Sequence, residues 1–569
     1  MLKPANGLKS SGWTYLLLAL IVLLGLAIRL YGLGERSMTH IEIYVPGIPL
    51  PAGLSDPEPR LTVKDTLFGM LYSAEPHPPG YYLLMLGWTR VFGAGIEALR
   101  LPSAVLGALC ILLVFILGMQ EKNRNAGLLG ALLLALNGHQ VFWSQLAKNY
   151  IWAEFIGLAA TVLLLQALGG GKRERWFQVM YLAMLLLGIS LTIYFWPILI
   201  AHLIWVVIEK WENRSLPGIF QWQYLALILG TPLVSLAIFQ SRRESYLDPN
   251  FLPSMARFLE LGYAIEVIPK AFAHLTWLNL LPPLLLVIGG IFLAAGLWSA
   301  RQAKDARPTN GIPTLLLLAA AIITIPVILF MGKYLSGDFQ RAGQNVMISA
   351  LLPAILIGLY YLLQLLWSHR EKWRGRLQVD APNRSNYKLS AYLAVLPVLS
   401  VAALSPVVAL FNSRGVMLYT PYLLLTMAAG ALALIKRSRA WIPILVIALL
   451  ILPIGNIFFR NSMLEHPNDY KGLAEQWIPE IQDDDLIFIR RHWVTTPIFY
   501  YLDAKQYTII SDLQPDGYRN AVQDFPDARV WVLTFPGLDE IPALEQALAD
   551  YKITDTIEAT NIQVDLYQR

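Results

Sequence analysis

The sequence contains almost no cysteine and little charge, and its C-terminal tail has no glycine-rich phosphate loop. The single cysteine, Cys110, falls inside an apolar run, so this chain cannot form an internal disulfide or a thiolate metal site. Only 15% of the residues are charged, whereas soluble globular proteins have about a quarter. The basic residues that give the formal charge of +5 are spread in short clusters between apolar runs. This pattern argues against a nucleic-acid partner and indicates membrane topology instead.

Long apolar runs dominate the first four-fifths of the chain. They are long enough to cross a bilayer, which takes about 20 residues, and they recur from Trp13 to Phe458 and then stop. The first run exceeds a typical signal-peptide core and is therefore predicted to be a membrane span. We predict a polytopic α-helical membrane domain over residues 1–460 with about thirteen transmembrane helices. The predicted spans are 13–33, 99–119, 126–143, 150–168, 176–193, 196–209, 222–241, 277–299, 313–331, 346–367, 389–411, 416–435 and 441–458.

The distribution of lysine and arginine predicts the topology. Every second loop between the predicted spans is basic, and basic loops lie on the cytoplasmic side. Basic residues on both sides of 176–209 require two crossings there, with a break near Tyr194–Pro197. The first loop, 34–98, and the tail, 461–569, are then extracytoplasmic. We predict a multi-pass protein of the cell (inner) membrane, surrounded by membrane lipids.

The first outer loop and the tail differ in character. The loop contains a half-apolar run, Tyr81–Phe92, which is too short to span and is predicted to be a helix lying in the membrane interface. The tail alternates helical patterns at 469–481, 496–502 and 541–551 with β-rich runs at 486–490, 507–511, 529–535 and 563–567. This alternation predicts a small extracytoplasmic α/β domain.

Two short motifs in the first loop contain groups able to act in catalysis or binding. In the first, His40 and Glu42 follow the first span, and a carboxylate held among apolar residues suits a general base or a metal ligand. The alternative for Glu42 is a solvated loop acid. In the second, Glu75 and His77 precede a pair of prolines, which presents the imidazole rigidly toward a phosphate or metal. The alternative is a proline-rich helix entry.

Two further motifs lie at outer span ends. Lys148 and Tyr150 begin the span at 150–168, where Lys148 could face an anionic ligand or serve as an ordinary interfacial anchor. Arg414 lies seven residues before Pro421 on the outer side, against the positive-inside bias. That position favours a role such as holding a phosphate.

These motifs together resemble the GT-C glycosyltransferases, in particular the protein O-mannosyltransferase and aminoarabinose-transferase group. The resemblance rests on the order of motifs: Gly34-Glu35-Arg36-Ser37, an acidic motif, His77-Pro78-Pro79, Ala98-Leu99-Arg100-Leu101-Pro102-Ser103, Ser144-Gln145-Leu146-Ala147-Lys148, and Arg414 to Pro421. It covers most of the chain and includes the number of spans and the outward α/β tail.

The resemblance implies direct transfer of a sugar from a polyprenyl-phosphate donor to an acceptor lipid, polysaccharide or protein on the periplasmic face. It assigns the acidic role to Glu42 and donor-phosphate contacts to Lys148 and Arg414, with His77 in the motif that precedes the prolines. His40, Glu75 and Tyr150 are predicted to contact substrate.

Two departures from the family pattern concern catalysis. Ile41 stands where the family often has aspartate, and Leu146 stands where it has glutamate. Either Glu42 serves alone, or the chain is a catalytically inactive scaffold.

Two further questions stay open at the level of sequence. A secondary transporter is the main alternative from another functional class. Many transporters contain an internal repeat, but no repeat of the first half of this sequence is evident in its second half. No cofactor is certain. A divalent metal ion is possible, with Glu75, His77 and His274 as candidate ligands that lack diagnostic spacing.

Overall fold

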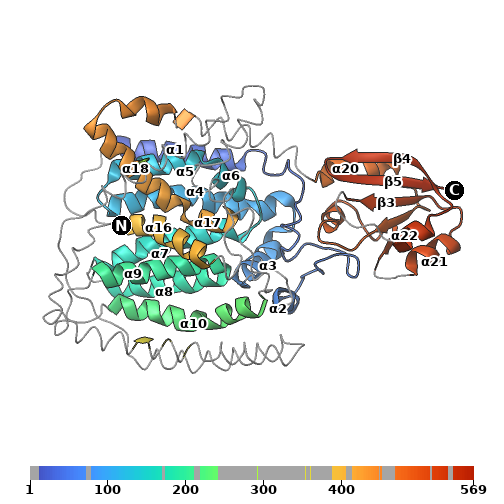
Figure 1. Ribbon diagram of the computed structural model, residues 1–569, viewed down its shortest axis with the longest axis horizontal. Coiled ribbons are helices and arrows are strands. Elements are labelled where there is room, and N and C mark those ends of the chain that lie inside the picture. The colour runs from blue at the N-terminus through green and yellow to red at the C-terminus, as the bar shows by residue number, and fades with distance from the viewer. Residues whose placement is uncertain are drawn as a thin grey trace.

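The protein consists of a helical bundle with a five-stranded sheet beyond one end (Figure 1). The computed structural model describes residues 12–71, 78–169, 173–209, 218–240, 388–404, 413–447, 468–512, 516–535 and 542–569, together with a few isolated positions. The sheet is built from the C-terminal residues, and the first loop lies at the end of the bundle that faces it.

The bundle helices follow the apolar runs of the sequence. They are α1 (Gly12–Leu30), α4 (Ile96–Gln120), α5 (Arg124–Leu136), α6 (Gly138–Ser144), α7 (Asn149–Leu168), α8 (Glu174–Leu191), α9 (Trp196–Glu209), α10 (Gly218–Gln240), α16 (Leu389–Leu404), α17 (Ser413–Val416) and α18 (Thr420–Arg437). Within the described residues, four stretches are long and apolar enough to cross a membrane, and the pair α5 and α6, bent by 62°, would make a fifth.

The positions of these helices agree with the predicted spans wherever the structure describes them. Three predicted spans lie almost wholly outside the described residues: 277–299, 313–331 and 346–367. Part of the span predicted at 441–458 also lies outside them. The total of about thirteen spans therefore stays a prediction.

The break predicted near Tyr194–Pro197 is confirmed. Between α8 and α9 the chain forms a single 3₁₀ turn, η1 (Ile193–Phe195). Thr192 has an extended backbone and its side chain accepts a hydrogen bond from the Tyr194 N–H, which starts the turn. Pro197 then occupies the first turn of α9, where a missing backbone N–H costs nothing.

The run predicted to lie in the membrane interface forms a helix, and its place at the interface stays a prediction. The helix is α3 (Gly80–Phe92), and the shorter α2 (Val63–Leu71) precedes it. Tyr81, Met85 and Thr89 recur every four residues on its buried face, while Val91 and Phe92 are exposed at its end. The helix therefore packs one side on the bundle and leaves apolar side chains at the surface.

The tail folds as a mixed sheet in the order β2-β1-β3-β5-β4. The strands are β1 (Leu486–Ile489), β2 (Thr508–Ser511), β3 (Val530–Thr534), β4 (Lys552–Ala559) and β5 (Ile562–Gln568). Strands β2, β1 and β3 are parallel, whereas β5 runs antiparallel to both β3 and β4. The helices of this part are α20 (Tyr470–Trp477), α21 (Gly517–Asp524) and α22 (Pro542–Ala547), with the 3₁₀ turns η4 (Ile478–Glu480) and η5 (Thr496–Tyr500).

The two faces of the sheet have different partners. Side chains such as Ile487 and Trp531 belong to a core that also contains α20 and continues into the bundle. The alternate residues, such as Phe488 and Val532, form a separate core with Tyr518 of α21. Since alternate residues of a strand point to opposite faces, one sheet supplies both cores.

Sequence patterns missed one strand and one helix of the tail. Strand β4 is almost entirely exposed and carries Lys, Thr, Asp and Glu, so it shows no apolar alternation. It forms because β5 offers it a free edge. Helix α21 is short and polar, with few apolar residues to reveal its period. The run predicted as a helix at 496–502 is the 3₁₀ turn η5.

A buried carboxylate fixes the start of β1. Asp485 accepts hydrogen bonds from Nε and Nη2 of Arg529 at 2.8 and 2.6 Å, and from the Trp531 indole N–H at 2.8 Å. It thereby joins the start of β1 to β3.

We expect Asp485→Asn to loosen the tail, because the amide loses the charge that two charge-assisted hydrogen bonds require. The expected cost is about 1–3 kcal/mol, measured as faster limited proteolysis of the tail in the full chain. Asp484→Asn is the matched control, since Asp484 is exposed. Equal proteolysis rates in the two variants would show that Asp485 is dispensable.

Candidate functional site

The first loop covers the end of the bundle that faces the sheet. Residues 31–62 contain no helix or strand, and they pack closely on α3. Gly47 has a positive φ of 91°, and a Cβ there would lie 2.2 Å from Oγ1 of Thr89. The same Thr89 hydroxyl donates to the Pro46 carbonyl at 3.0 Å. Glycine at 47 allows the loop to lie directly against the helix.

A buried ion pair between Glu42 and Arg100 lies at the centre of this region. Arg100 donates from Nε to one carboxylate oxygen at 2.9 Å and from Nη2 to the other at 2.7 Å. Its remaining N–H groups donate to the carbonyls of Leu33, Arg36 and Ser37 at 2.8–3.0 Å. All five donors of the guanidinium are therefore used, each on the first loop or its entry.

The Glu42 carboxylate is equally occupied. It is 0% exposed and also accepts from the Thr39 N–H and hydroxyl at 3.1 and 3.0 Å, and from the Ala147 N–H at 2.9 Å. Burial by itself raises the pKa of Glu42, but the Arg100 charge and these hydrogen bonds hold it below its ordinary value. Glu42 is thus an ionised carboxylate enclosed by donors.

The corner between α6 and α7 brings Lys148 to the same place. The side-chain amide of Gln145 donates to three carbonyls at the end of α1, at 3.0–3.2 Å, and so fixes the corner. Lys148 is only 3% exposed, and its Nζ lies 5.6 Å from the centre of the Tyr44 ring. Ala147 directly precedes Lys148, and its N–H donates to Glu42. The predicted cation therefore follows the residue that binds the predicted carboxylate.

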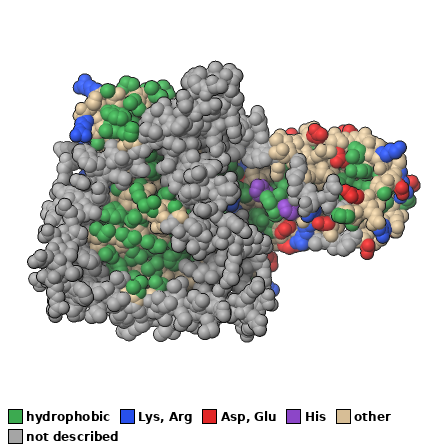
Figure 2. Space-filling view, viewed as in Figure 1, with side chains coloured by type: hydrophobic (Ala, Val, Ile, Leu, Met, Phe, Trp, Pro, Cys, Tyr) green, Lys and Arg blue, Asp and Glu red, His purple; other side chains and the backbone are tan. Residues whose placement is uncertain are grey.

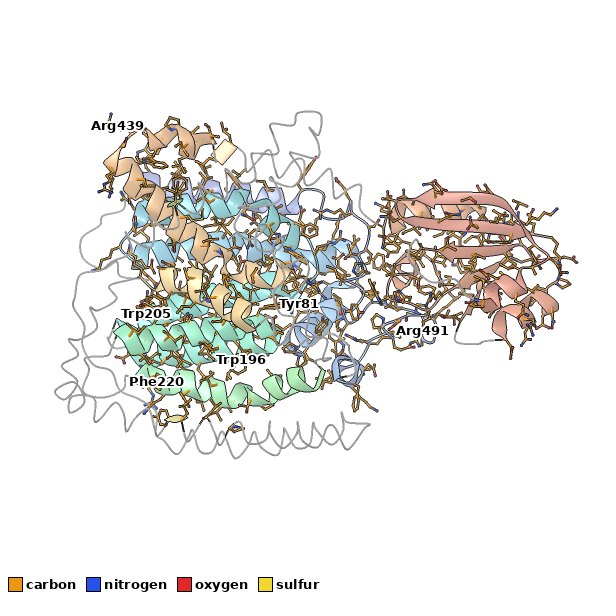
Figure 3. The ribbon with its side chains drawn as sticks, in the orientation of Figure 1. Tyr81, Trp196, Trp205, Phe220, Arg439 and Arg491 are labelled. Carbon is orange, nitrogen blue, oxygen red and sulfur yellow. The ribbon has the colours of Figure 1, made fainter. Side chains whose placement is uncertain are left out.

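Three buried polar atoms around the start of α7 have no hydrogen-bond partner among the described residues: the Tyr81 hydroxyl, the Trp152 indole N–H and the Asn149 side-chain oxygen. The Tyr81 and Trp152 rings meet edge to face at 5.7 Å, and Asn149 lies one helical turn before Trp152. Burial raises the pKa of Tyr81 well above its ordinary value, so the phenol keeps its proton. Figure 3 places Tyr81 at the end of the bundle that faces the sheet.

Arg414 and Tyr150 occupy different surroundings. Arg414 lies in α17, where the backbone at Gly415 lies directly against the Tyr194 ring. Next along the chain, the Met417 carbonyl accepts from the Gln140 side chain of α6 at 3.2 Å. This turn packs on η1 and α6, and a contact of Arg414 with phosphate stays a prediction. Tyr150 is buried against Trp143, with ring centres 5.1 Å apart.

The tail is hydrogen-bonded to the loop that carries Glu42. The Ser37 hydroxyl donates to Asp469 at 2.7 Å and accepts from the Lys471 N–H at 3.0 Å. The Met38 N–H donates to the Tyr501 hydroxyl at 2.7 Å. The bonded residues lie within five positions of Glu42, so the tail helps to fix the candidate site.

A second set of contacts joins the tail to the later part of the loop. Asp56 and Thr496 exchange hydrogen bonds at 2.9 Å, and Arg491 donates to the Ser55 carbonyl at 2.8 Å. Arg491 also pairs with Glu58. Figure 3 shows Arg491 at the junction between bundle and sheet.

His40 lies in this same junction, apart from Glu42. Its ring is 4.7 Å from that of Trp493, which contacts His492 on the other side at 5.0 Å. Trp493 is 39% exposed. Histidine side chains are visible at the narrow waist of the molecule in Figure 2.

Three sequence candidates cannot be placed. Glu75, His77 and His274 lie outside the described residues. Within the part of the chain that the structure describes, no three histidine, cysteine or acidic side chains gather as a metal site would require.

Arg100 has a role that the sequence motif Ala98–Ser103 does not predict. An arginine in an apolar span was the available signal, because intramembrane charges are paired. Two more charged residues of the apolar helices have neutral hydrogen-bond partners instead: Arg29 donates to Ser144 at 3.2 Å, and Glu154 accepts from Gln140 at 2.6 Å.

Comparison with known proteins agrees with the sequence motifs. Residues 76–238 match the family model described as dolichyl-phosphate-mannose-protein mannosyltransferase. This match confirms the predicted resemblance for that segment, which contains Lys148 and Arg100. No curated protein matches the chain at a significant level.

Solved structures of three glycosyltransferases are similar over most of the chain. ArnT from Cupriavidus metallidurans bound to undecaprenyl phosphate is 14% identical, with 98% of each chain covered and a TM-score of 0.41. The oligosaccharyltransferase AglB from Archaeoglobus fulgidus, in complex with an inhibitory peptide and a dolichol-phosphate, is 12% identical, with 97% of this chain and 74% of that one covered and a TM-score of 0.42. Arabinofuranosyltransferase AftD from Mycobacteria is 10% identical, with 100% and 40% covered and a TM-score of 0.45.

A double-mutant cycle tests the ion pair. We expect Glu42→Gln and Arg100→Gln each to destabilise the protein by about 3–5 kcal/mol, because each leaves one buried charge without its partner. The double variant should cost less than the sum of the two, since no unpaired charge remains. The measurement is thermal unfolding of the purified protein in detergent.

Additive effects would mean that Glu42 and Arg100 act independently. Glu97→Gln is the matched control, because Glu97 lies in the same turn of α4 as Arg100 but is exposed. It should change the unfolding temperature little.

Proposed function

We propose that this chain is a membrane glycosyltransferase that moves a sugar from a polyprenyl-phosphate donor to an acceptor on the outer, periplasmic face. The family match over residues 76–238 and the apolar helices support a multi-pass enzyme of this kind. In the reaction, the bond between the sugar's anomeric carbon and the phosphate oxygen breaks, and the acceptor oxygen attacks the same carbon from the opposite face. The phosphate leaves with the electron pair.

The observation that carries the proposal is the set of unpaired polar atoms around the start of α7, which Lys148 directly precedes. The buried Lys148, the Tyr81 hydroxyl and the Trp152 N–H together supply positive charge and donors for an anion. Such groups stabilise the charge that develops on a leaving phosphate, and they act strongly because the surroundings exclude water. The Asn149 oxygen could accept from a sugar hydroxyl. We place the donor phosphate here, with Arg414 as a further contact.

Two roles of Glu42 in the reaction are compatible with its contacts: general base and positioning residue. As the base, it would take the proton that the acceptor hydroxyl loses, and its ionised state suits that role. Its oxygens are, however, occupied by Arg100, Thr39 and Ala147, so one donor would have to release it. The same contacts support a positioning role more directly, in which Glu42 fixes the backbone before Lys148.

A catalytically inactive scaffold is the second candidate. It is favoured by the enclosed carboxylate of Glu42 together with Ile41 at the position where the family often has aspartate. A secondary transporter has no comparable observation in its favour. A transfer assay separates the enzyme from the scaffold.

The proposed topology can be tested by cysteine labelling. Ala52, Asn520 and Ser438 are all exposed, and cysteine at each should react with a membrane-impermeant maleimide only from its own side. We expect Ala52→Cys and Asn520→Cys to react in intact cells with a permeabilised outer layer, and Ser438→Cys only after the membrane is opened. The native Cys110 is buried and can be replaced by alanine. Reaction of all three variants from outside would contradict the topology.

The donor site can be tested by transfer from a polyprenyl-phosphate sugar pool in membranes. We expect Lys148→Gln to reduce transfer by about a hundredfold or more, because removing one preorganised charge from a developing anion has effects of that size. Lys64→Gln is the matched control, since Lys64 is an exposed lysine of α2, in the first loop. The proteins are compared at equal amounts in the membrane.

Glu42→Gln in the same assay separates the two forms of its role. Loss of transfer with normal donor binding supports the base, and retained transfer in a less stable protein supports positioning. No transfer by the wild-type chain with any donor in the pool would favour the scaffold.

A further inference from the structure

A cavity beside the residues that bind the Glu42 carboxylate is not lined by the residues of the proposed donor site. It measures about 220 Å³ and lies between the first loop, the α6–α7 corner and the start of α20. Its lining comprises Glu35, Arg36, Ser37, Thr39, Phe142, Leu146, Asn468, Asp469, Lys471, Gly472 and Glu475. The bundle, the loop and the tail therefore each contribute part of its wall.

The lining of the cavity is apolar on one side and polar on the other. Phe142 and Leu146 come from the bundle and supply the apolar side. The loop and α20 supply the polar side, with three carboxylates against one guanidinium and one ammonium. Charges of both signs in nearly equal number offer both donors and acceptors, and they give little net attraction to a polyanion.

The cavity adjoins the catalytic candidates through two of its lining residues. Thr39 donates to Glu42 from its hydroxyl at 3.0 Å. Leu146 directly precedes Ala147, whose N–H donates to the same carboxylate at 2.9 Å. Glu42 thus joins the wall of this cavity to the backbone that leads to Lys148, as adjoining acceptor and donor sites would require.

We propose that this cavity binds one neutral sugar ring of the acceptor. The inference rests on the proposed transferase function and names its acceptor as a carbohydrate. A pyranose has C–H groups on its faces and hydroxyls around its edge, and each hydroxyl both donates and accepts. That pattern complements an apolar wall facing carboxylate, amide and ammonium groups. The volume corresponds to roughly seven waters, which is of the order of one hexose ring.

A larger crevice gives the ring a route from the membrane surface. It measures about 740 Å³, shares Glu35 and Lys471 with the cavity, and reaches the apolar Leu30, Leu33 and Leu101 at the ends of α1 and α4. A glycan carried on a lipid can thus approach along the bundle and place its sugar between loop and tail.

The test is saturation-transfer difference NMR on the full chain in detergent, with methyl α-glycosides of glucose, galactose and mannose as probes. We expect saturation transfer to at least one glycoside in the wild type. The double variant Lys471→Ala/Glu475→Ala should weaken the affinity by about tenfold or more, because two hydrogen-bonding side chains of the polar wall are removed.

The matched control is the double variant Gln476→Ala/Glu480→Ala. Both of its residues are exposed on the same segment but do not line the cavity, so it should bind glycosides as the wild type does. Absence of saturation transfer to every glycoside, or equal loss in the two double variants, overturns the proposal. Saturation transfer to a serine-containing tripeptide and not to the glycosides also overturns it, in favour of a protein acceptor.

Failure of this inference is distinguishable from failure of the proposed function. Glycoside binding without sugar transfer from the polyprenyl-phosphate pool contradicts the transferase but keeps the sugar site. Transfer by the wild type without glycoside binding contradicts the sugar site alone.

Discussion

The end of the bundle that faces the sheet depends on one buried ion pair. An arginine near the end of an apolar helix is costly unless its charge and all its donors are satisfied. Arg100 of α4 is satisfied by the Glu42 carboxylate and by three carbonyls of the first loop and its entry. This requirement makes an irregular loop adopt one path. The same carboxylate binds the Ala147 N–H, so the pair also fixes the backbone that precedes Lys148.

The tail continues this arrangement. Ser37, whose carbonyl accepts from Arg100, also bonds Asp469 and Lys471 of the tail through its hydroxyl. The hydrophobic core is likewise continuous from the bundle into one face of the sheet. The C-terminal part is therefore joined to the loop at the level of the candidate site, and the proposed acceptor cavity has walls from both.

Within the bundle, polar side chains link helices that are distant in sequence. His202 of α9 contacts the hydroxyls of Thr161 and Tyr181 at 3.1 and 3.0 Å, and Tyr422 of α18 reaches Thr161 at 2.9 Å. Such bonds select one packing of apolar helices, whose surfaces alone are nearly interchangeable in lipid. They hold α7 against its neighbours, and the start of α7 carries Lys148, Asn149 and Trp152.

The sequence by itself determined the bundle helices that the structure describes, the break before Pro197, most strands of the tail and the short motifs around Glu42 and Lys148, since apolar periodicity and charge are local properties. It missed strand β4, whose polar residues form a strand only because β5 provides an edge. Only the tertiary structure decided that Glu42 is enclosed by Arg100, that His40 lies against Trp493 and that the cavity beside Thr39 exists. Each of these depends on residues tens to hundreds of positions apart, and no local pattern records which partner a buried charge will find.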